Sequence, residues 1–131
     1  DALIISIGGM LHTALTASES AAQLGISAAV WSCPSLKPLD IQAIVAAAVQ
    51  YPLIMTVEEG NVNGGLGGAV AEVLATLPRS STRLVKVGVP EDVILSSAYS
   101  QATALDQVGL AAQHLCERLV AAVALADKVT G

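Results

Sequence analysis

Short apolar runs rich in β-branched residues alternate along the chain with longer stretches in which apolar residues recur at helical spacing. The short runs predict four strands, at 3–7, 26–31, 53–57 and 84–87. The first run is apolar almost throughout, which is typical of a strand that is covered on both faces of a sheet. The chain therefore consists of strands separated by helices.

The first two predicted helices have clear boundary signals. Gly25 is a stop signal for the first helix, and Asp40 is the expected N-cap of the second. The inward face of the first helix is expected to hold Met10, Ala14, Ala17, Ala21 and Leu24. That of the second is expected to hold Ile41, Ile44, Val45, Ala48 and Val49.

Two further helices are predicted toward the carboxyl end of the chain, and residues 93–104 show no clear period. Apolar residues of the third helix follow the i, i+3, i+4, i+7 pattern most closely: Leu66, Ala69, Val70, Val73, Leu74 and Leu77. The last helix is predicted from Leu105 to Ala126. Its inward face is expected to hold Val108, Ala112, Leu115, Leu119, Ala122 and Ala126.

Four strands separated by helices imply right-handed crossovers and a parallel sheet with helices on both faces, which is an α/β fold. The length of 131 residues fits one domain, spanning 1–131. Because the first residue is Asp1 and not Met, and Leu3 already begins an apolar strand, we expect the chain to be a piece of a longer protein.

Composition removes several function classes. The formal net charge is −5 and aromatic residues make up 2% of the chain, which argues against a surface that binds nucleic acid. No clean apolar run of about 20 residues is present, so we expect no membrane span. Cys33 and Cys116 form no disulfide framework and no zinc set. Both are expected to be buried thiols in a reducing, cytoplasmic compartment.

The glycine-rich turn at 63–68 lies between a predicted strand and a predicted helix. Such turns can hold a phosphate on free backbone N–H groups. The dinucleotide fingerprint fails, because a start at Gly65 places Val70 where a third glycine is required, and no phosphate-loop lysine follows. The alternative interpretation is that the glycines permit a tight turn and a close approach of helix to sheet.

Other polar candidates lie near strand ends. Glu58 and Glu59 end the third predicted strand and point to opposite sides, so one can face the crevice while the other meets the next helix N-terminus. His12 follows a Gly-Gly strand end and is suited to act as a neutral hydrogen-bond donor, whereas His114 is interpreted as structural. No G-x-S-x-G nucleophile elbow and no metal-ligand spacing occur.

Three motifs in order resemble one family over nearly the whole chain. They are SIGGM at 6–10 with His12, LKPLD at 36–40, and VEEG at 57–60 followed by GGLGGAVAEV at 64–73. Together they resemble the C-terminal domain of transketolases, with the nearest likeness to the C-terminal half of split, two-subunit transketolases. The same domain occurs in deoxyxylulose-phosphate synthases and in the beta subunits of 2-oxoacid dehydrogenase E1 components. In split transketolases a histidine often follows the paired glutamates, where Gly60 stands here.

The resemblance implies a three-layer α/β/α sandwich with a mainly parallel sheet. The strands present would have the order 2-1-3-4, and a further antiparallel strand would come from upstream. The turns at 8–12 and 58–65 would then meet at one rim of the sheet, at the switch point between the first and third strands.

The resemblance also implies a role. Transketolases use thiamine diphosphate and a divalent metal, Mg or Ca, to move a two-carbon ketol unit between sugar phosphates. Upstream domains or an upstream subunit hold both groups, and this sequence lacks the usual Gly-Asp-Gly diphosphate motif. The family's cofactor-activating glutamate also belongs upstream, so neither Glu58 nor Glu59 inherits that role. This chain would then bind no cofactor, supply no catalytic residue and be inactive alone. It would support assembly of a homodimer or heterotetramer.

An alternative hypothesis is that the rim binds a small anionic regulator or a substrate phosphate. The candidate anion-binding residues are Gly8, Gly9, His12, Glu59, Gly64, Gly65 and Gly67.

Overall fold

A computed structural model describes residues 1–92 and 101–130, and within this part four parallel strands form one sheet. The strands are β1 (Ala2–Ile7), β2 (Ala28–Cys33), β3 (Leu53–Asn61) and β4 (Arg83–Val89). Their order is β2-β1-β3-β4, with β1 paired to both β2 and β3, and β3 paired to β4. The predicted order 2-1-3-4 and the parallel sheet are confirmed.

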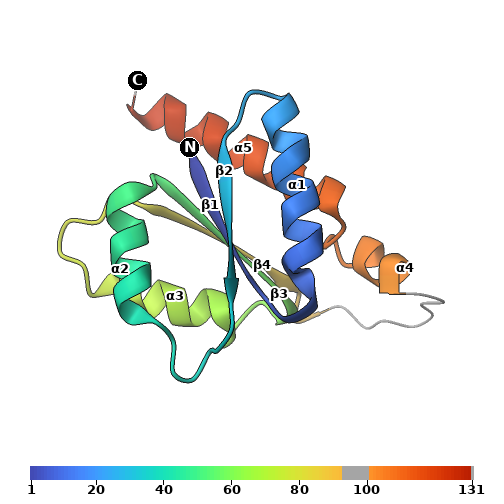
Figure 1. The fold of residues 1–131 in the computed structure, drawn as a ribbon, viewed down its shortest axis with the longest axis horizontal. Coiled ribbons are helices and arrows are strands. Elements are labelled where there is room, and N and C mark those ends of the chain that lie inside the picture. Colours follow the sequence, from blue (N-terminus) through green and yellow to red (C-terminus); the bar gives the residue numbers. More distant parts are fainter. Residues whose placement is uncertain (93–100, 131) are drawn as a thin grey trace.

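Helices cover both faces of this sheet, so the fold is a three-layer sandwich (Figure 1). On one face lie α1 (Leu11–Gln23) and α5 (Ala112–Thr130), which pack on each other. On the other face lie α2 (Ile41–Gln50) and α3 (Leu66–Ala75). A short 3-10 turn, η1 (Gly8–Met10), joins β1 to α1, and α4 (Gln101–Gln107) precedes α5.

Alternation along the strands divides the core into two layers. Ile4, Met55 and Val57 face α1 and α5, whereas Leu3, Ile5 and Ile54 face α2 and α3. All six side chains are buried, so both central strands are covered on both sides, as the apolar run at 3–7 predicted. The two thiols lie in different layers: Cys116 of α5 is buried on the α1–α5 side, and Cys33 is only partly buried on the α2–α3 side, so the expectation of two buried thiols is wrong for Cys33.

Local signals in the sequence set the helix boundaries. Gly25 adopts φ +83° and ends α1, while Ile26 N–H donates to the carbonyl of Ala21 at 3.0 Å. Asp40 is the N-cap of α2, because its carboxylate accepts a hydrogen bond from Ala43 N–H at 3.0 Å. Both predicted boundaries are confirmed.

The prediction of one continuous helix from Leu105 to Ala126 is wrong. α4 ends at Gln107, and α5 begins only at Ala112. Gly109 adopts φ +74°, and Leu110 N–H donates to the carbonyl of Leu105 at 2.7 Å, which closes α4. The expected inward faces are also too wide: Leu24, Ile41 and Val49 are exposed by 65%, 57% and 87%.

The residues at 103–129 have the length and apolar composition of a membrane-spanning helix, although the sequence predicted no such span. In the fold this stretch is interrupted between α4 and α5. Leu115, Leu119 and Ala122 of α5 are buried against the sheet and α1, which is the pattern of a core helix. Of the segment 93–104 that showed no period, only 101–104 fall within the described residues, at the start of α4.

The register of α3 yields a stability test. Val73 is 8% exposed and faces the sheet, so Val73→Asp would bury an unpaired carboxylate. We expect the free energy of unfolding to fall by about 3–5 kcal/mol, and the chain should no longer unfold cooperatively in urea. Ala75→Asp changes an exposed position of the same helix and should stay folded. A cooperative, stable Val73→Asp chain would contradict the packing of α3.

Candidate functional site

The carboxyl ends of β1 and β3 meet at one rim of the sheet. Gly8 and Gly9 follow β1, and the end of β3 runs beside the η1 turn. A Cβ atom added at Gly9 would lie 3.2 Å from Oε1 of Glu59, so the Glu59 carboxylate covers this glycine. The predicted meeting of the two glycine-bearing turns at a switch point is confirmed.

Glu58 is the buried acid of the rim. It is 5% exposed, and both of its carboxylate oxygens accept hydrogen bonds from the first turn of α3. Leu66 N–H donates to Oε1 at 3.1 Å, and Gly67 N–H donates to Oε2 at 2.9 Å. The positive end of the helix dipole favours a carboxylate at this place. Of the two adjacent glutamates, Glu58 therefore meets the helix N-terminus, and Glu59 is exposed.

At two positions of the turn only glycine fits, because other side chains lie very close to the backbone there. A Cβ atom at Gly65 would lie 1.8 Å from Oε1 of Glu58, so no larger residue leaves the carboxylate in place. A Cβ atom at Gly67 would lie 2.8 Å from the aliphatic stem of Lys86 and 2.9 Å from Oγ1 of Thr56. Gly64 contributes differently, because it adopts φ +77°. The interpretation as a tight turn and close helix–sheet packing is confirmed at these positions.

Two polar residues beneath this turn were not predicted from the sequence. Thr56 is fully buried, and its hydroxyl has no hydrogen-bond partner within the described part of the chain. Lys86 lies opposite Thr56 in the β3–β4 pairing and extends its ammonium group to Oδ1 of Asn63, at 3.5 Å. The sequence signal was limited to one polar residue inside each of two otherwise apolar strands, because the pairing of the two residues depends on the strand register.

The structure brings together only part of the predicted anion-binding set. Gly9 lies against Glu59, and the N–H group of Gly67 is already bonded to Glu58. His12 is exposed in the first turn of α1, and within residues 1–92 and 101–130 its ring makes no hydrogen bond. The anion site stays a prediction, and any anion would have to use groups other than the Gly67 amide.

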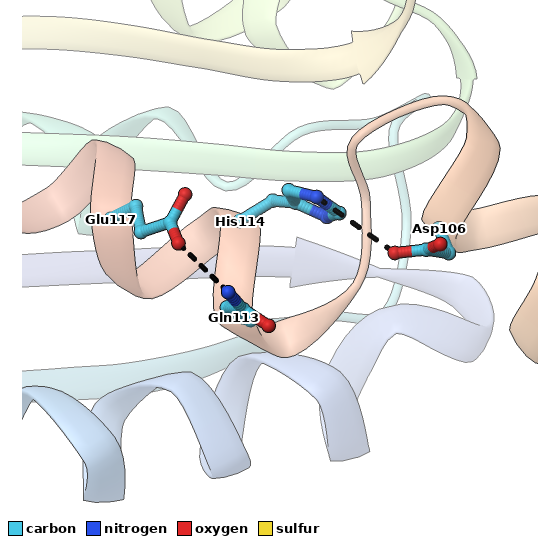
Figure 2. Close-up of polar contacts among 4 residues, drawn as sticks. All are labelled: Asp106, Gln113, His114 and Glu117. Atoms are coloured by element: carbon cyan, nitrogen blue, oxygen red, sulfur yellow. Dashed lines mark hydrogen bonds and ion pairs between the residues drawn. The ribbon is translucent and has the colours of Figure 1, made fainter.

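His114 lies far from the rim turns in sequence and joins α4 to α5. Figure 2 shows its ring directed at Asp106, with Nε2 3.8 Å from Oδ1, while Gln113 donates to Glu117 at 3.0 Å. The second ring nitrogen, Nδ1, is buried and has no hydrogen-bond partner among the described residues. The contact of His114 with Asp106 links α5 to α4, which agrees with the structural interpretation of His114.

The described residues contain no group of three His, Cys, Asp or Glu side chains placed to hold a metal ion. The rim also does not fit a diphosphate, because an internal carboxylate already occupies the α3 N–H groups that could receive one. The chemistry that this arrangement supports is therefore packing and positioning.

A parallel sheet of this order, with helices on both faces and an acid-capped turn at the switch point, defines a flavodoxin-like three-layer α/β domain. The chain belongs to the family of transketolase C-terminal domains: the family model "Transketolase, C-terminal domain" matches residues 1–115.

The curated relatives carry the name 1-deoxy-D-xylulose-5-phosphate synthase. The protein from Synechococcus sp. (strain JA-2-3B'a(2-13)) is 39% identical over 119 residues, covering 91% of this chain and 18% of the relative. Synthase 2 of Kitasatospora griseola is 36% identical over 123 residues, covering 94% of this chain and 19% of the relative. The chain thus spans about a fifth of the length of these proteins.

A solved structure shares the fold. It is described as "Split gene transketolase, inactive beta4 tetramer" and aligns with a TM-score of 0.75 and 36% identity. The alignment covers 89% of this chain and 36% of that chain.

The contact between Glu58 and α3 yields a double-mutant prediction. Glu58→Ala leaves two buried N–H groups unpaired and should lower the free energy of unfolding by about 2–3 kcal/mol. Gly65→Ala displaces the same carboxylate and should cost a similar amount. In the double variant the second change should add little, because the contact is already lost. Urea denaturation measures the free energy of unfolding of each variant.

Glu19→Ala is the control for this cycle, since it removes an exposed acid in α1. It should change the free energy of unfolding by less than about 0.5 kcal/mol. Additive costs of Glu58→Ala and Gly65→Ala would contradict the close approach of the carboxylate to Gly65.

Occupancy of the helix N-terminus also predicts a ligand response. Titration with inorganic phosphate should leave the Leu66 and Gly67 amide resonances unmoved in ¹H–¹⁵N spectra, because Glu58 holds both groups. The Glu58→Ala chain, if folded, should show saturable shifts at these two amides. Saturable shifts in the unchanged chain would show that the carboxylate can be displaced.

Proposed function

We propose that this chain is the C-terminal domain of a thiamine-diphosphate-dependent enzyme of the transketolase family, and that it serves assembly and does not hold the cofactor. The observation that carries this proposal is the buried Glu58 carboxylate. It fills the glycine-rich helix N-terminus where a diphosphate could otherwise be held. The motifs at 6–10, 36–40 and 57–73 support the family role.

The activity to which the domain contributes is the transfer of a two-carbon unit, a ketol in the case of a transketolase. Thiamine diphosphate and its divalent metal supply the carbanion chemistry when they are bound in the upstream part of the enzyme. The residues of this chain stay outside that chemistry. They present a rigid surface to the cofactor-binding domains and support the multimer, in the cytoplasm.

The comparisons support two candidates for the parent enzyme of this domain. A synthase of 1-deoxy-D-xylulose 5-phosphate is supported by the names of the curated relatives, and a split transketolase by the name of the solved structure. Both give the domain the same assembly role.

Reconstitution tests the proposal. The chain alone should bind no thiamine diphosphate in calorimetry with Mg²⁺ present, and it should show no two-carbon transfer. Added to the cofactor-binding domains or subunit of its own parent enzyme, it should co-elute with them and raise turnover at least about tenfold, because assembly positions the reacting groups. Turnover assays with a 2-oxoacid donor and with a ketose-phosphate donor separate the two enzyme forms.

The unfolded Val73→Asp chain serves as the negative control and should give no increase in turnover. Tight binding of thiamine diphosphate by the isolated chain would overturn the proposal. So would a failure to associate with the cofactor-binding part.

A further inference from the structure

The two edges of the sheet differ in charge. Of the four described strands only β4 carries cations, Arg83 and Lys86, and Arg118 of α5 adds a third that contacts it. Three of the six Lys and Arg residues of the chain thus lie at one edge strand. β2, the strand at the opposite edge, contains no charged side chain. An edge strand exposes unpaired N–H and C=O groups, and charged side chains are one means by which proteins protect it.

Hydrogen bonds at both ends of β4 show which of its backbone groups face the open edge. Arg83 N–H donates to the carbonyl of Pro52 at 2.9 Å, and the carbonyl of Val89 accepts from Val62 N–H at 3.0 Å. Successive residues of a strand direct their N–H and C=O groups to opposite sides in turn. The odd-numbered residues of β4 therefore bond toward β3. The even-numbered residues point their backbone groups away from the sheet, and these are Leu84, Lys86 and Gly88.

Arg118 caps the middle one of these outward carbonyls. From α5, its Nη2 donates to the carbonyl of Lys86 at 3.3 Å. Arg83 makes the reverse contact, because its Nη1 donates to the carbonyl of Ala122, one turn further along α5, at 3.3 Å. The two guanidinium groups therefore tie α5 to β4 in both directions. Arg118 is thereby held on a backbone acceptor that an added strand would need.

Lys86 is a second barrier at this edge. Its side chain points inward under α3, since a Cβ atom at Gly67 would lie 2.8 Å from its aliphatic stem. Its ammonium group reaches Oδ1 of the exposed Asn63, at 3.5 Å. The rest of the segment 84–89 is apolar and rich in valine, a composition that favours pairing with other strands. An inward-pointing lysine opposes such pairing, because a strand laid along the edge would remove water from the charge.

We propose that Arg118 and Lys86 close the β4 edge of the sheet against pairing with another strand. Arg118 occupies the backbone acceptor in the middle of β4, and Lys86 places a charge in an otherwise apolar strand. Within residues 1–92 and 101–130 no strand covers this edge, so side chains alone supply the protection there. The proposal concerns the edge of the sheet and does not rest on the proposed function.

Removal of the cap tests the proposal. Arg118 is exposed, so Arg118→Ala should fold like the original chain. In the original chain, hydrogen exchange followed by NMR should show fast exchange of the amides of residues 84 and 86 at every protein concentration. In Arg118→Ala the protection of these two amides should rise with concentration, by about tenfold or more, because they become bonded to β4 of a second copy.

A matched control separates the cap from a general loss of charge. Arg79→Ala removes the same charge at an exposed position between α3 and β4, and it should leave the exchange of both amides independent of concentration. Cooperative unfolding in urea checks that each variant is folded.

The second barrier is tested on top of the first. Lys86→Val makes the segment 84–89 continuously apolar, so Lys86→Val/Arg118→Ala should gain protection at a lower concentration than Arg118→Ala. Equal behaviour of the two variants would contradict the role of Lys86. If the double variant does not fold, Arg118→Ala alone decides the proposal.

Two results would overturn the closed edge. One is exchange in Arg118→Ala that does not depend on concentration. The other is slow exchange of the two amides in the original chain, which would show that another segment or molecule already covers β4. Because the measurement is local to β4, association of the original chain through a different surface does not alter it. The reconstitution assay likewise reports on the proposed function alone.

Discussion

The carboxylate of Glu58 is the contact on which the rim of this domain depends. It ties the end of a central strand to the first turn of the following helix through two backbone N–H groups. A buried charge is tolerated only where such partners are fixed in place, so the carboxylate also fixes the turn between β3 and α3. Gly65 is part of the same device, because only a residue without a Cβ atom leaves room for the acid. The neighbouring Glu59 closes the other side of the rim over Gly9.

The sheet and its core could be predicted from sequence because their signals are local and strong. An apolar run such as Leu3–Ile7 has few places to lie except the middle of a parallel sheet. Asp40 marks a helix start by a side-chain hydrogen bond, and Gly25 marks a helix end by its positive φ. The 2-1-3-4 order came from the family resemblance, since pattern alone gives alternation and not neighbours.

Errors arose where periodicity continues past a backbone signal. The stretch 105–126 is apolar at helical spacing on both sides of Gly109, and the pattern therefore hides the break between α4 and α5. Leu24 and Val49 fit the helical period in the same way but lie at the final turns of α1 and α2, where they are exposed. Helical spacing marks one face of a helix and does not show how far the neighbouring layer extends along it.

The site was predicted only in outline. Alternation along a strand shows that one of two adjacent glutamates must turn inward, but the choice of Glu58 requires knowing that Ile54 faces α3. The pairing of Thr56 with Lys86 depends on the register between β3 and β4, which no local signal fixes. The glycines of the turn were visible from the start, yet their cause, an acid eight residues upstream of the helix, became clear only in three dimensions.

The acid-capped turn can be regarded as a receptor whose ligand is part of its own chain. Related α/β folds leave this corner open for a nucleotide or a phosphate, and here a side chain has taken that position permanently. A single change that shortens residue 58 would free the two N–H groups at the start of α3, and it would also remove the contact that holds the turn. The same two amides are a structural contact while residue 58 carries a carboxylate, and they become available to an external anion when it does not.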